Sequence, residues 1–391
     1  MDQVWANRAA SAEAAIAKRH AKRLWGLPGT QLGVVAWPAA RQHRLFGVWH
    51  YWWQAHLLDC LVDAQLRDPQ PERLKTIARH IRGHRLRNNG SWVNDYYDDM
   101  AWLALALERA GRLAGVGRPK ALNKLSEQFV NAWVPEDGGG IPWRKQDQFF
   151  NAPANGPAAI FLARYEERLR RAQQMADWID ESLIDPETHL VFDGLKGGSL
   201  VRAQYTYCQG VVLGVETELA ARTDDPDHAE RVHRLVAAVN EHMTADGVIK
   251  GAGGGDGGLF SGILARYLAL VVTTLPQSGP EDAKARDTAR ELVLKSAQSA
   301  WDLRQTVDGL PLFGPFWDRN AEVPSAGGKE AQFVEGAVNA SEVPERDLSV
   351  QLSGWMLMEA AHTVTAGSGD DGTAASGDDG TAASGDTVTE A

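Results

Sequence analysis

The strongest constraint on the fold is an alternation of polar and apolar helical segments along the 391-residue chain. The polar segments are Asn7–Leu24, Pro71–Leu86, Pro119–Trp133, Leu169–Leu183, Pro226–Met243 and Glu281–Arg304. The apolar segments that follow them are Phe46–Leu66, Tyr97–Leu113, Ala152–Tyr165, Ala203–Ala221, Leu259–Thr273 and Leu348–Val364. A helix that is apolar on nearly all sides is buried, whereas a polar one lies at the surface. The pattern therefore predicts six couples of one outer and one inner helix.

Helical couples spaced by roughly 50 to 60 residues are typical of repeat architectures, in which neighbouring hairpins bury a shared face. We predict an all-α fold, an (α/α)6 barrel of six helical hairpins that occupies residues 1–365. A closed ring covers every inner helix, whereas an open solenoid, the alternative, needs a cap at each end. Only Leu190–Phe192 and Gly247–Ile249 are short and apolar enough to be strands.

The connections between the segments differ in length. Those that lead from an apolar helix to the next polar one are short, as in Arg67–Gln70 and Arg222–Asp225. Those that lead from a polar helix to an apolar one are long and rich in glycine and aromatic residues, as in Trp25–Leu45, Val134–Asn151 and Gln305–Asp347. In a ring of antiparallel hairpins, all the long connections lie at the rim where the inner helices begin. Because long loops of compact domains carry function, we expect the functional site at this rim.

The segment Asn94–Leu107 places two adjacent carboxylates, Asp98 and Asp99, in the first turn of a helix that is apolar nearly all round. Aspartate at a helix start often does no more than cap free backbone N–H groups. The aromatic neighbours, Trp92 and Trp102 among them, and the apolar sequence behind the pair favour a functional role. Two ionised carboxylates a few Å apart repel each other, so the pKa of one of them is expected to rise.

The long connections also bring aromatic side chains to the predicted rim. These are Trp37, Trp92, Trp143, Phe149, Phe150, Phe313, Phe316 and Trp317. Sugar faces stack on flat apolar rings, while sugar hydroxyls need polar partners such as Asn, Gln and Asp. We therefore predict a carbohydrate-binding cleft and include Trp92, Trp143, Trp317 and Asp256 among the side chains that contact the sugar.

Two carboxylates in a sugar-binding cleft suggest hydrolysis of a glycosidic bond, in which one acts as general acid and the other as nucleophile or base. Neighbouring residues have Cα atoms about 3.8 Å apart. Their side chains can separate to the ~5–5.5 Å of a retaining enzyme but hardly to the ~6.5–9.5 Å of an inverting one. If Asp98 and Asp99 are both catalytic, the reaction retains configuration. Alternatively, only one is catalytic and its partner lies on another inner helix.

Several short motifs follow one another along the chain in a specific order. They are Trp52-Trp53-Gln54-Ala55-His56, Tyr96-Tyr97-Asp98-Asp99, Asn155-Gly156-Pro157-Ala158, Asp185-Pro186-Glu187-Thr188, Tyr205-Thr206-Tyr207-Cys208-Gln209-Gly210 and Phe260-Ser261-Gly262. Together they resemble the pattern of glycoside hydrolase family 76, the endo-acting α-1,6-mannanases. The resemblance covers roughly residues 1–364.

The resemblance implies an (α/α)6-barrel enzyme that cleaves α-1,6-mannosidic linkages within mannan-type glycans with retention and without a metal ion or other cofactor. It also implies that Asp98 is the nucleophile and Asp99 the general acid and base. The motif residues that it assigns to the substrate are Trp53, Gln54, Tyr97, Asn155, Tyr207, Gln209 and Phe260. The partner that follows from it is an α-mannan oligosaccharide or polysaccharide.

Two motif positions depart from the family pattern. Cys208 stands where the pattern has Asn, and Ser261 stands where it has Lys. Both changes remove polar reach from the expected cleft, which leaves two other functions open. One is a non-catalytic mannan-binding protein. The other is a different six-hairpin sugar enzyme, either an inverting hydrolase or an epimerase.

The charge distribution bears on other classes of partner. The formal charge is −11, but six of the acidic residues lie in the Gly/Ser/Asp/Thr/Ala-rich tail at 366–391, which has no basic residue and is predicted to be disordered. The rest of the chain carries −5 (40 basic minus 45 acidic residues), which argues against nucleic-acid binding. His80 and His84 share a helix face, but Ile81 stands where a zinc-hydrolase helix carries Glu, so we predict no metal site there.

Localisation and assembly are predicted from weaker signals. The chain opens without a basic and apolar leader, so it is expected to be cytoplasmic as given, or secreted if its start is incomplete. Cys60 and Cys208 lie in apolar helical segments, where a buried thiol is expected to stay reduced. The chain contains no run of about 18 apolar residues, so the sequence predicts no membrane span. We expect a monomer.

Overall fold

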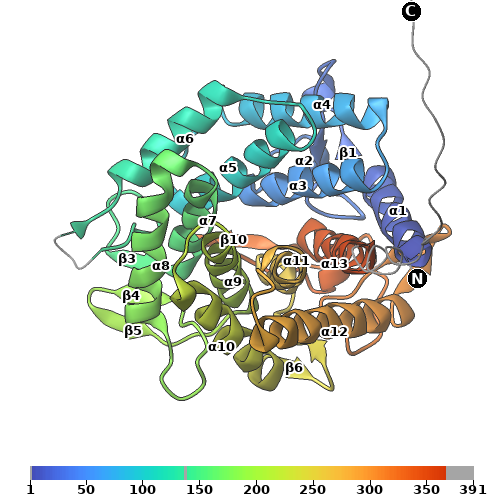
Figure 1. Cartoon of the computed structure of the whole chain (residues 1–391). Helices are drawn as coiled ribbons and strands as arrows, with labels where there is room; N and C mark the ends of the chain where they lie inside the picture. Colours follow the sequence, from blue (N-terminus) through green and yellow to red (C-terminus); the bar gives the residue numbers. More distant parts are fainter. Residues whose placement is uncertain (1, 136–138, 367–391) are drawn as a thin grey trace, which may run out of the picture.

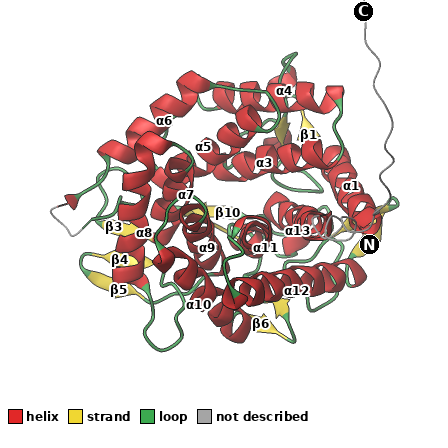
Figure 2. Ribbon diagram, in the orientation of Figure 1, coloured by secondary structure: helices red, strands yellow, loops and turns green. Residues whose placement is uncertain are grey.

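The computed structural model describes residues 2–135 and 139–366, and its described part is built on twelve long helices in two concentric layers (Figures 1 and 2). The outer helices are α1 (Asp2–Arg19), α4 (Pro71–Arg87), α6 (Pro119–Asn131), α8 (Leu169–Leu183), α10 (Pro226–His242) and α12 (Pro280–Asp302). The inner helices are α3 (Tyr51–Arg67), α5 (Tyr97–Arg112), α7 (Ala152–Ala163), α9 (Thr206–Ala220), α11 (Gly257–Thr274) and α13 (Leu348–Ala366). The predicted tail lies outside the described residues, apart from Ala366, which ends α13.

The inner helices form a closed ring. Each packs against the next in chain order, and α13 returns to pack against α3. Every residue of α7 is buried, whereas α4 buries one stripe that includes Ile77, His80, Ile81 and His84. This difference follows from the sequence, since the inner segments are apolar all round and the outer ones are apolar at helical spacing on one side. The predicted (α/α)6 barrel is confirmed.

The helix starts follow from local sequence. Proline occupies the first turn of α4, α6, α10 and α12, where its missing N–H would have no partner and its fixed φ suits the helix. The starts of α7 and α10 are also capped by side chains, because Asn151 accepts a bond from the Ala154 N–H and Asp225 accepts one from the Asp227 N–H. Helix α8 has neither signal, yet it begins and ends at the residues predicted from the sequence, Leu169 and Leu183.

Short structures decorate the connections. The remaining helical turns are α2 (Arg41–Arg44), η1 (Leu24–Gly26), η3 (Glu166–Arg168) and η4 (Pro344–Arg346). The strands are β1 (Ala21–Lys22), β2 (Leu32–Gly33), β3 (Phe149–Asn151), β4 (Gly194–Lys196), β5 (Ser199–Val201), β6 (Thr244–Ala245), β7 (Val248–Ile249), β8 (Gln305–Val307), β9 (Leu310–Leu312), β10 (Gln332–Val334) and β11 (Ala337–Asn339). All pair antiparallel, as β3-β4-β5 and as the four two-stranded ribbons β1-β2, β6-β7, β8-β9 and β10-β11.

Of the two predicted strands, one is confirmed and one is wrong. Val248–Ile249 forms β7, but in the segment Leu190–Phe192 only Val191 pairs, through an isolated bridge to Ile184. The other ribbons have no counterpart in the prediction. Strands of two or three residues are too short to show the alternation that identifies a strand in a sequence.

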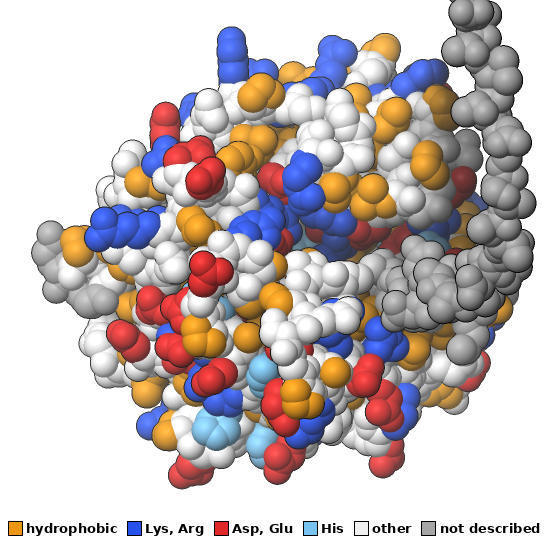
Figure 3. All heavy atoms as spheres, in the orientation of Figure 1, with side chains coloured by type: hydrophobic (Ala, Val, Ile, Leu, Met, Phe, Trp, Pro, Cys, Tyr) orange, Lys and Arg blue, Asp and Glu red, His pale blue; other side chains and the backbone are white. Residues whose placement is uncertain are grey.

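Helix α11 is, by length and composition, apolar enough to cross a membrane, yet it stands in the inner ring and its neighbours bury most of it. Its hydrophobicity therefore reflects its place in the barrel. On the face of the molecule drawn in Figure 3, acidic and basic side chains are interspersed rather than gathered into a field of one sign.

Candidate active site

A cleft of about 570 Å³ opens at the rim where the inner helices begin. Its walls come from the starts of α3, α5, α9 and α11, from the connections that precede α3, α5, α7, α9 and α11, and from the β10–β11 hairpin. This is the rim predicted from the unequal connection lengths. The rim thus combines the positive ends of several helix dipoles with side chains from segments far apart in the sequence.

Asp98 and Asp99 lie half-buried in this cleft, at the start of α5. The carboxylate of Asp98 accepts two hydrogen bonds, one from the Trp143 indole (2.9 Å) and one from the backbone N–H of Asp99 (2.8 Å). The carboxylate of Asp99 accepts one bond, from the side-chain amide of Asn94 (2.6 Å). The two neighbours therefore have different surroundings, although they share one helical turn.

The electrostatics separate the two carboxyls further. Burial raises the pKa of Asp98 to about 7, although its two N–H donors stabilise the charged form. Burial and the neighbouring charge of Asp98 raise the pKa of Asp99 well above its usual value. Asp98 is therefore the first of the two to ionise, and Asp99 is the one that retains its proton to higher pH. One carboxylic acid and one carboxylate in contact with the same cleft form a pair suited to acid and nucleophile chemistry.

Asp256, at the start of α11, joins three elements of the cleft wall. One carboxylate oxygen accepts bonds from the indoles of both Trp52 (3.0 Å) and Trp53 (2.9 Å), and the other accepts the backbone N–H of Val338 (2.7 Å). Burial raises the pKa of Asp256 to about 6, while these donors lower it. Asp256 thus fixes the start of α3 and the β10–β11 hairpin relative to α11.

Aromatic rings line two sides of the cleft. On the side of Asp98, the Trp143 ring packs edge-on against Phe149 (6.0 Å between centroids) and Tyr96 (5.2 Å). On the other side, Tyr207 and Phe260 are stacked 3.9 Å apart. Flat rings of this kind offer apolar faces to pyranose rings, and the carboxyls between them offer acceptors to hydroxyls.

The sequence matches the family model for Glycosyl hydrolase family 76 over residues 8–352. The chain belongs to this family. Among solved structures it is similar to the GH76A α-1,6-mannanase of Salegentibacter sp. HEL1_6, at 29% identity and a TM-score of 0.75, over 91% of this chain and 98% of that one. It is also similar to the Lin0763 protein of Listeria innocua, at 26% identity and a TM-score of 0.76, over 93% and 98%. No curated protein matches it.

A third solved structure is an inactive variant of the Salegentibacter enzyme in which two consecutive aspartates are replaced by asparagine, in complex with α-1,6-mannotriose. It is 27% identical to this family 76 protein, with a TM-score of 0.76 over 92% of this chain and 99% of that one.

Six of the residues predicted from the sequence line the cleft of this family 76 protein. They are Asp98, Asp99, Trp143, Tyr207, Asp256 and Phe260. Trp53 lies directly behind the wall, fully buried, with its indole bound to Asp256. Its contact with the cleft is therefore indirect.

Three predicted substrate contacts, Gln54, Asn155 and Gln209, are buried side-chain amides that bind backbone instead. Each pairs with both the N–H and the C=O of one residue in the preceding long connection, at 2.7–3.0 Å: Gly33, Ile141 and Val191 respectively. Gln351 of α13 does the same with Phe313, at 3.1 and 2.8 Å. Four inner helices thus pin the connection that leads to them, and this role replaces the predicted one.

The other three predicted contacts also lie outside the cleft lining. Trp92 is half-buried beneath the guanidinium of Arg85, with 5.3 Å to the ring centroid. Tyr97 is half-buried against the hydrophobic core. Trp317 is buried, and its backbone C=O accepts a bond from Ser299. Side chains of a rim loop can point inward to anchor the loop, and the sequence does not distinguish that orientation from one that faces the cleft.

The structure adds lining residues that the prediction did not single out. Trp52 belongs to a motif already noted, Asp193 follows the apolar segment Leu190–Phe192, and Phe333 stands in the β10–β11 hairpin. The Cys208 thiol lies 3.9 Å from a carboxylate oxygen of Asp193, whose pKa burial raises to about 6. The Glu335-Gly336 dipeptide between Gln332–Val334 and Ala337–Asn339 was the available signal for the hairpin.

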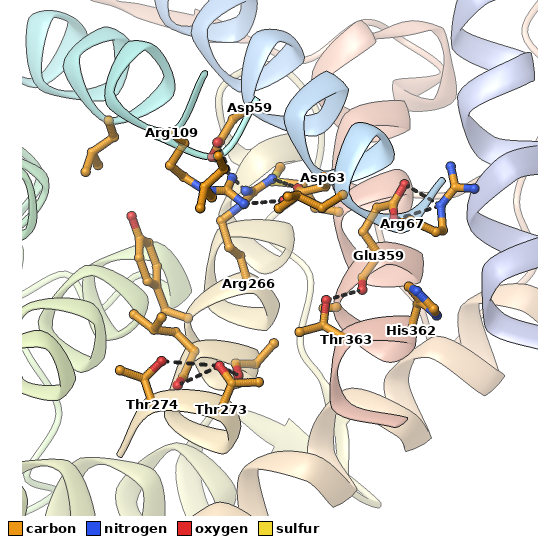
Figure 4. Close-up of a pocket in the computed structure, with 18 of the residues that line it drawn as sticks. Asp59, Asp63, Arg67, Arg109, Arg266, Thr273, Thr274, Glu359, His362 and Thr363 are labelled. Carbon is orange, nitrogen blue, oxygen red and sulfur yellow. Dashed lines mark hydrogen bonds and ion pairs between the residues drawn. The ribbon is translucent and has the colours of Figure 1, made fainter. Parts of the chain in front are cut away.

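A second pocket, of about 480 Å³, lies at the opposite end of the barrel, where the inner helices end (Figure 4). There Arg109 and Arg266 each bridge both Asp59 and Asp63, which closes a quartet of ion pairs between α3, α5 and α11. Although burial raises the pKa of Asp59, the two guanidiniums hold it below its usual value. The quartet thus joins α3, α5 and α11 through paired charges.

Proposed function

We propose that this protein is a retaining endo-α-1,6-mannanase, in which Asp98 is the nucleophile and Asp99 the general acid and base. The observation that carries the proposal is the pair itself: two N–H donors stabilise the anion of Asp98, while burial and the charge of Asp98 raise the pKa of Asp99. The side chains of adjacent residues can reach the short separation of about 5–5.5 Å that retention requires, but hardly the longer one of an inverting enzyme.

The chemistry proceeds in two displacements. Asp99 gives its proton to the bridging oxygen while the bond from that oxygen to C1 breaks, and an Asp98 oxygen bonds to C1. Asp99, now ionised, then takes a proton from water as the water oxygen bonds to C1 and the bond to Asp98 breaks. Each step exchanges one bond at C1, and the proton returns to Asp99.

The proposed substrate rests on the side chains that line the cleft and on the similarity of this protein to a known enzyme. The stacked rings of Tyr207 and Phe260 and the Trp143 ring fit pyranose faces. The similar Salegentibacter enzyme is an α-1,6-mannanase whose variant lacking two consecutive aspartates is inactive and binds α-1,6-mannotriose. We propose the monomer expected from the sequence as the working form. Size-exclusion chromatography with light scattering tests that state.

The test uses linear α-1,6-mannan and separates the two carboxyls. We expect the wild type to release reducing ends, and Asp98→Asn and Asp99→Asn each to lower that rate at least a thousandfold. Asp95→Asn is the matched control, because Asp95 lies on the same rim with 83% of its side chain exposed. ¹H NMR of the first product is expected to show the α-anomer.

Full turnover by either Asn variant would refute the assignment of that residue. A first product with the β-anomer would show an inverting enzyme. Binding of mannan fragments without release of reducing ends by the wild type would make the protein a glycan-binding one.

A further inference from the structure

The β10–β11 hairpin, residues 332–339, projects from the connection between α12 and α13 and contributes a wall of the cleft. Its two-residue turn, Glu335 and Gly336, has positive φ at both positions (52° and 99°), as a tight hairpin turn of this length requires. Phe333, Gly336, Val338 and other residues of the hairpin line the cleft. A segment distant in sequence from Asp98 thus reaches the same cavity.

The hairpin is fixed at its base. Val338 and Asp256 are joined twice, since the Val338 N–H donates to the Asp256 carboxylate (2.7 Å) and the Asp256 N–H donates to the Val338 C=O (2.9 Å). Beside the hairpin, Ser341 accepts the Ala331 N–H (2.9 Å) and its own N–H donates to the buried carboxylate of Asp347 (3.1 Å). These bonds hold the hairpin in one position over the cleft.

The tip of the hairpin contacts Trp143, whose indole donates a hydrogen bond to Asp98. A Cβ atom added to Gly336 would lie 2.5 Å from the Trp143 ring, so the backbone of the tip and that ring are in close contact. The same indole donates its N–H to the Asp98 carboxylate at 2.9 Å. An unbroken series of contacts therefore runs from the hairpin tip through Trp143 to Asp98.

Phe333 presents an aromatic ring to the cleft. It is 61% exposed, the largest exposed fraction among the large apolar side chains of the described part of the chain. Side chains alternate along a strand, so its neighbour Val334 points to the other face and is absent from the cleft lining. An exposed, flat ring at the edge of a cavity lined by other rings is a stacking surface, and no ring of the described residues stacks on it.

We propose that the β10–β11 hairpin is a positioning arm for the glycan: Phe333 stacks on a sugar unit away from the bond that is cleaved, and Gly336 keeps Trp143 on Asp98. The inference rests on the proposed mannanase function and deepens it, because it assigns a specificity role to a segment outside the family motifs. Binding energy from the remote sugar is then used at the element that orients the nucleophile.

The first test varies the length of the substrate. On α-1,6-manno-oligosaccharides, Phe333→Ala is expected to raise KM about three- to tenfold for long oligomers, the range expected for one aromatic stack. For the shortest oligomer that the wild type cleaves, Phe333→Ala should leave KM unchanged. Val334→Ala, on the other face of the same strand, is the matched control. A loss that is equal at every length, or no loss at all, would overturn the role of Phe333.

The second test separates the effect of Gly336 on the position of Trp143 from its effect on the thermal stability of the protein. Gly336→Ala adds the Cβ that meets Trp143, whereas Gly309→Ala, in the β8–β9 turn, has a similar positive φ (77°) and nothing within 4 Å of the added atom. Both variants lose the freedom of glycine at positive φ, so Gly309→Ala measures the loss of thermal stability from that cause alone. Only Gly336→Ala should lower kcat, about tenfold and at every substrate length, and move the acid limb of the pH profile upward.

Equal kcat values in the two glycine variants would refute the contact between the tip and Trp143. If the wild type cleaves no α-1,6-mannan, the proposed function fails, and calorimetry with α-1,6-mannotetraose still decides the role of Phe333. Weaker binding by Phe333→Ala than by the wild type supports the arm, and equal binding overturns it.

Discussion

Replacement of Trp143 by phenylalanine removes the indole N–H that Asp98 accepts at 2.9 Å and keeps an aromatic ring in place. A hydrogen bond to a charged group contributes about 1.5–3 kcal/mol, and one pKa unit corresponds to about 1.36 kcal/mol. Because this bond stabilises the ionised form, its loss should raise the pKa of Asp98 by about one to two units, from a starting value of about 7. At pH 7 the ionised fraction then falls about 5- to 50-fold.

The assay is the pH dependence of kcat/KM on an α-1,6-manno-oligosaccharide, whose acid limb reports the ionisation of the nucleophile in the free enzyme. Trp143→Phe should move that limb to higher pH and recover activity as the pH rises. Trp92→Phe is the matched control, since Trp92 is a half-buried tryptophan of the same rim that does not line the cleft. An acid limb that stays in place in Trp143→Phe, in a variant with normal thermal stability, would refute the link between this indole and Asp98.

Three further outcomes are expected. Arg109→Leu leaves two buried aspartates with one guanidinium, so urea denaturation should show a loss of about 3–5 kcal/mol in the free energy of unfolding; an unchanged midpoint would contradict this. Burial lowers the pKa of His20 and His80 to about 4. Protonation of each should therefore cost about 2 kcal/mol of folding stability as the pH falls from about 6.5 to 5. Equal melting temperatures at pH 7 and pH 5 would contradict this expectation. Asn94→Ala removes a donor that lowers the pKa of Asp99, so the alkaline limb of the activity profile should move upward, and a downward move would reverse the assigned sign.

The fold was predictable because burial in this barrel follows a simple rule. Segments such as Ala203–Ala221 are apolar on every side and become inner helices, and segments such as Leu169–Leu183 have one apolar stripe and become outer ones. The pair Asp98 and Asp99 stood out because both charged residues lie in the first turn of a helix that is otherwise apolar nearly all round. The unequal connections then placed that helix start at the correct rim.

The rest of the site was not predictable, because the orientation of each side chain depends on the group that it contacts, and a sequence pattern does not specify that group. Gln54 and Gln209 lie beside aromatic motif residues, but their amides are turned toward backbone groups inside the barrel. Trp317 belongs to a rim loop yet points into the core. The strands beside Phe333 are three residues long, so tertiary contacts with Asp256 and Trp143 hold the hairpin where local sequence preference does not.

The four amides that pin the long connections also divide the rim into separately replaceable parts. Because Gln54, Asn155, Gln209 and Gln351 each clamp a single residue of the connection by its peptide groups, the start of the inner helix is set by that clamp rather than by the length of chain around it. We therefore expect that segments on either side of these amides can be lengthened without a shift of α3, α7, α9 or α13. A barrel of this design can acquire a new glycan preference one loop at a time while Asp98 and Asp99 stay where they are.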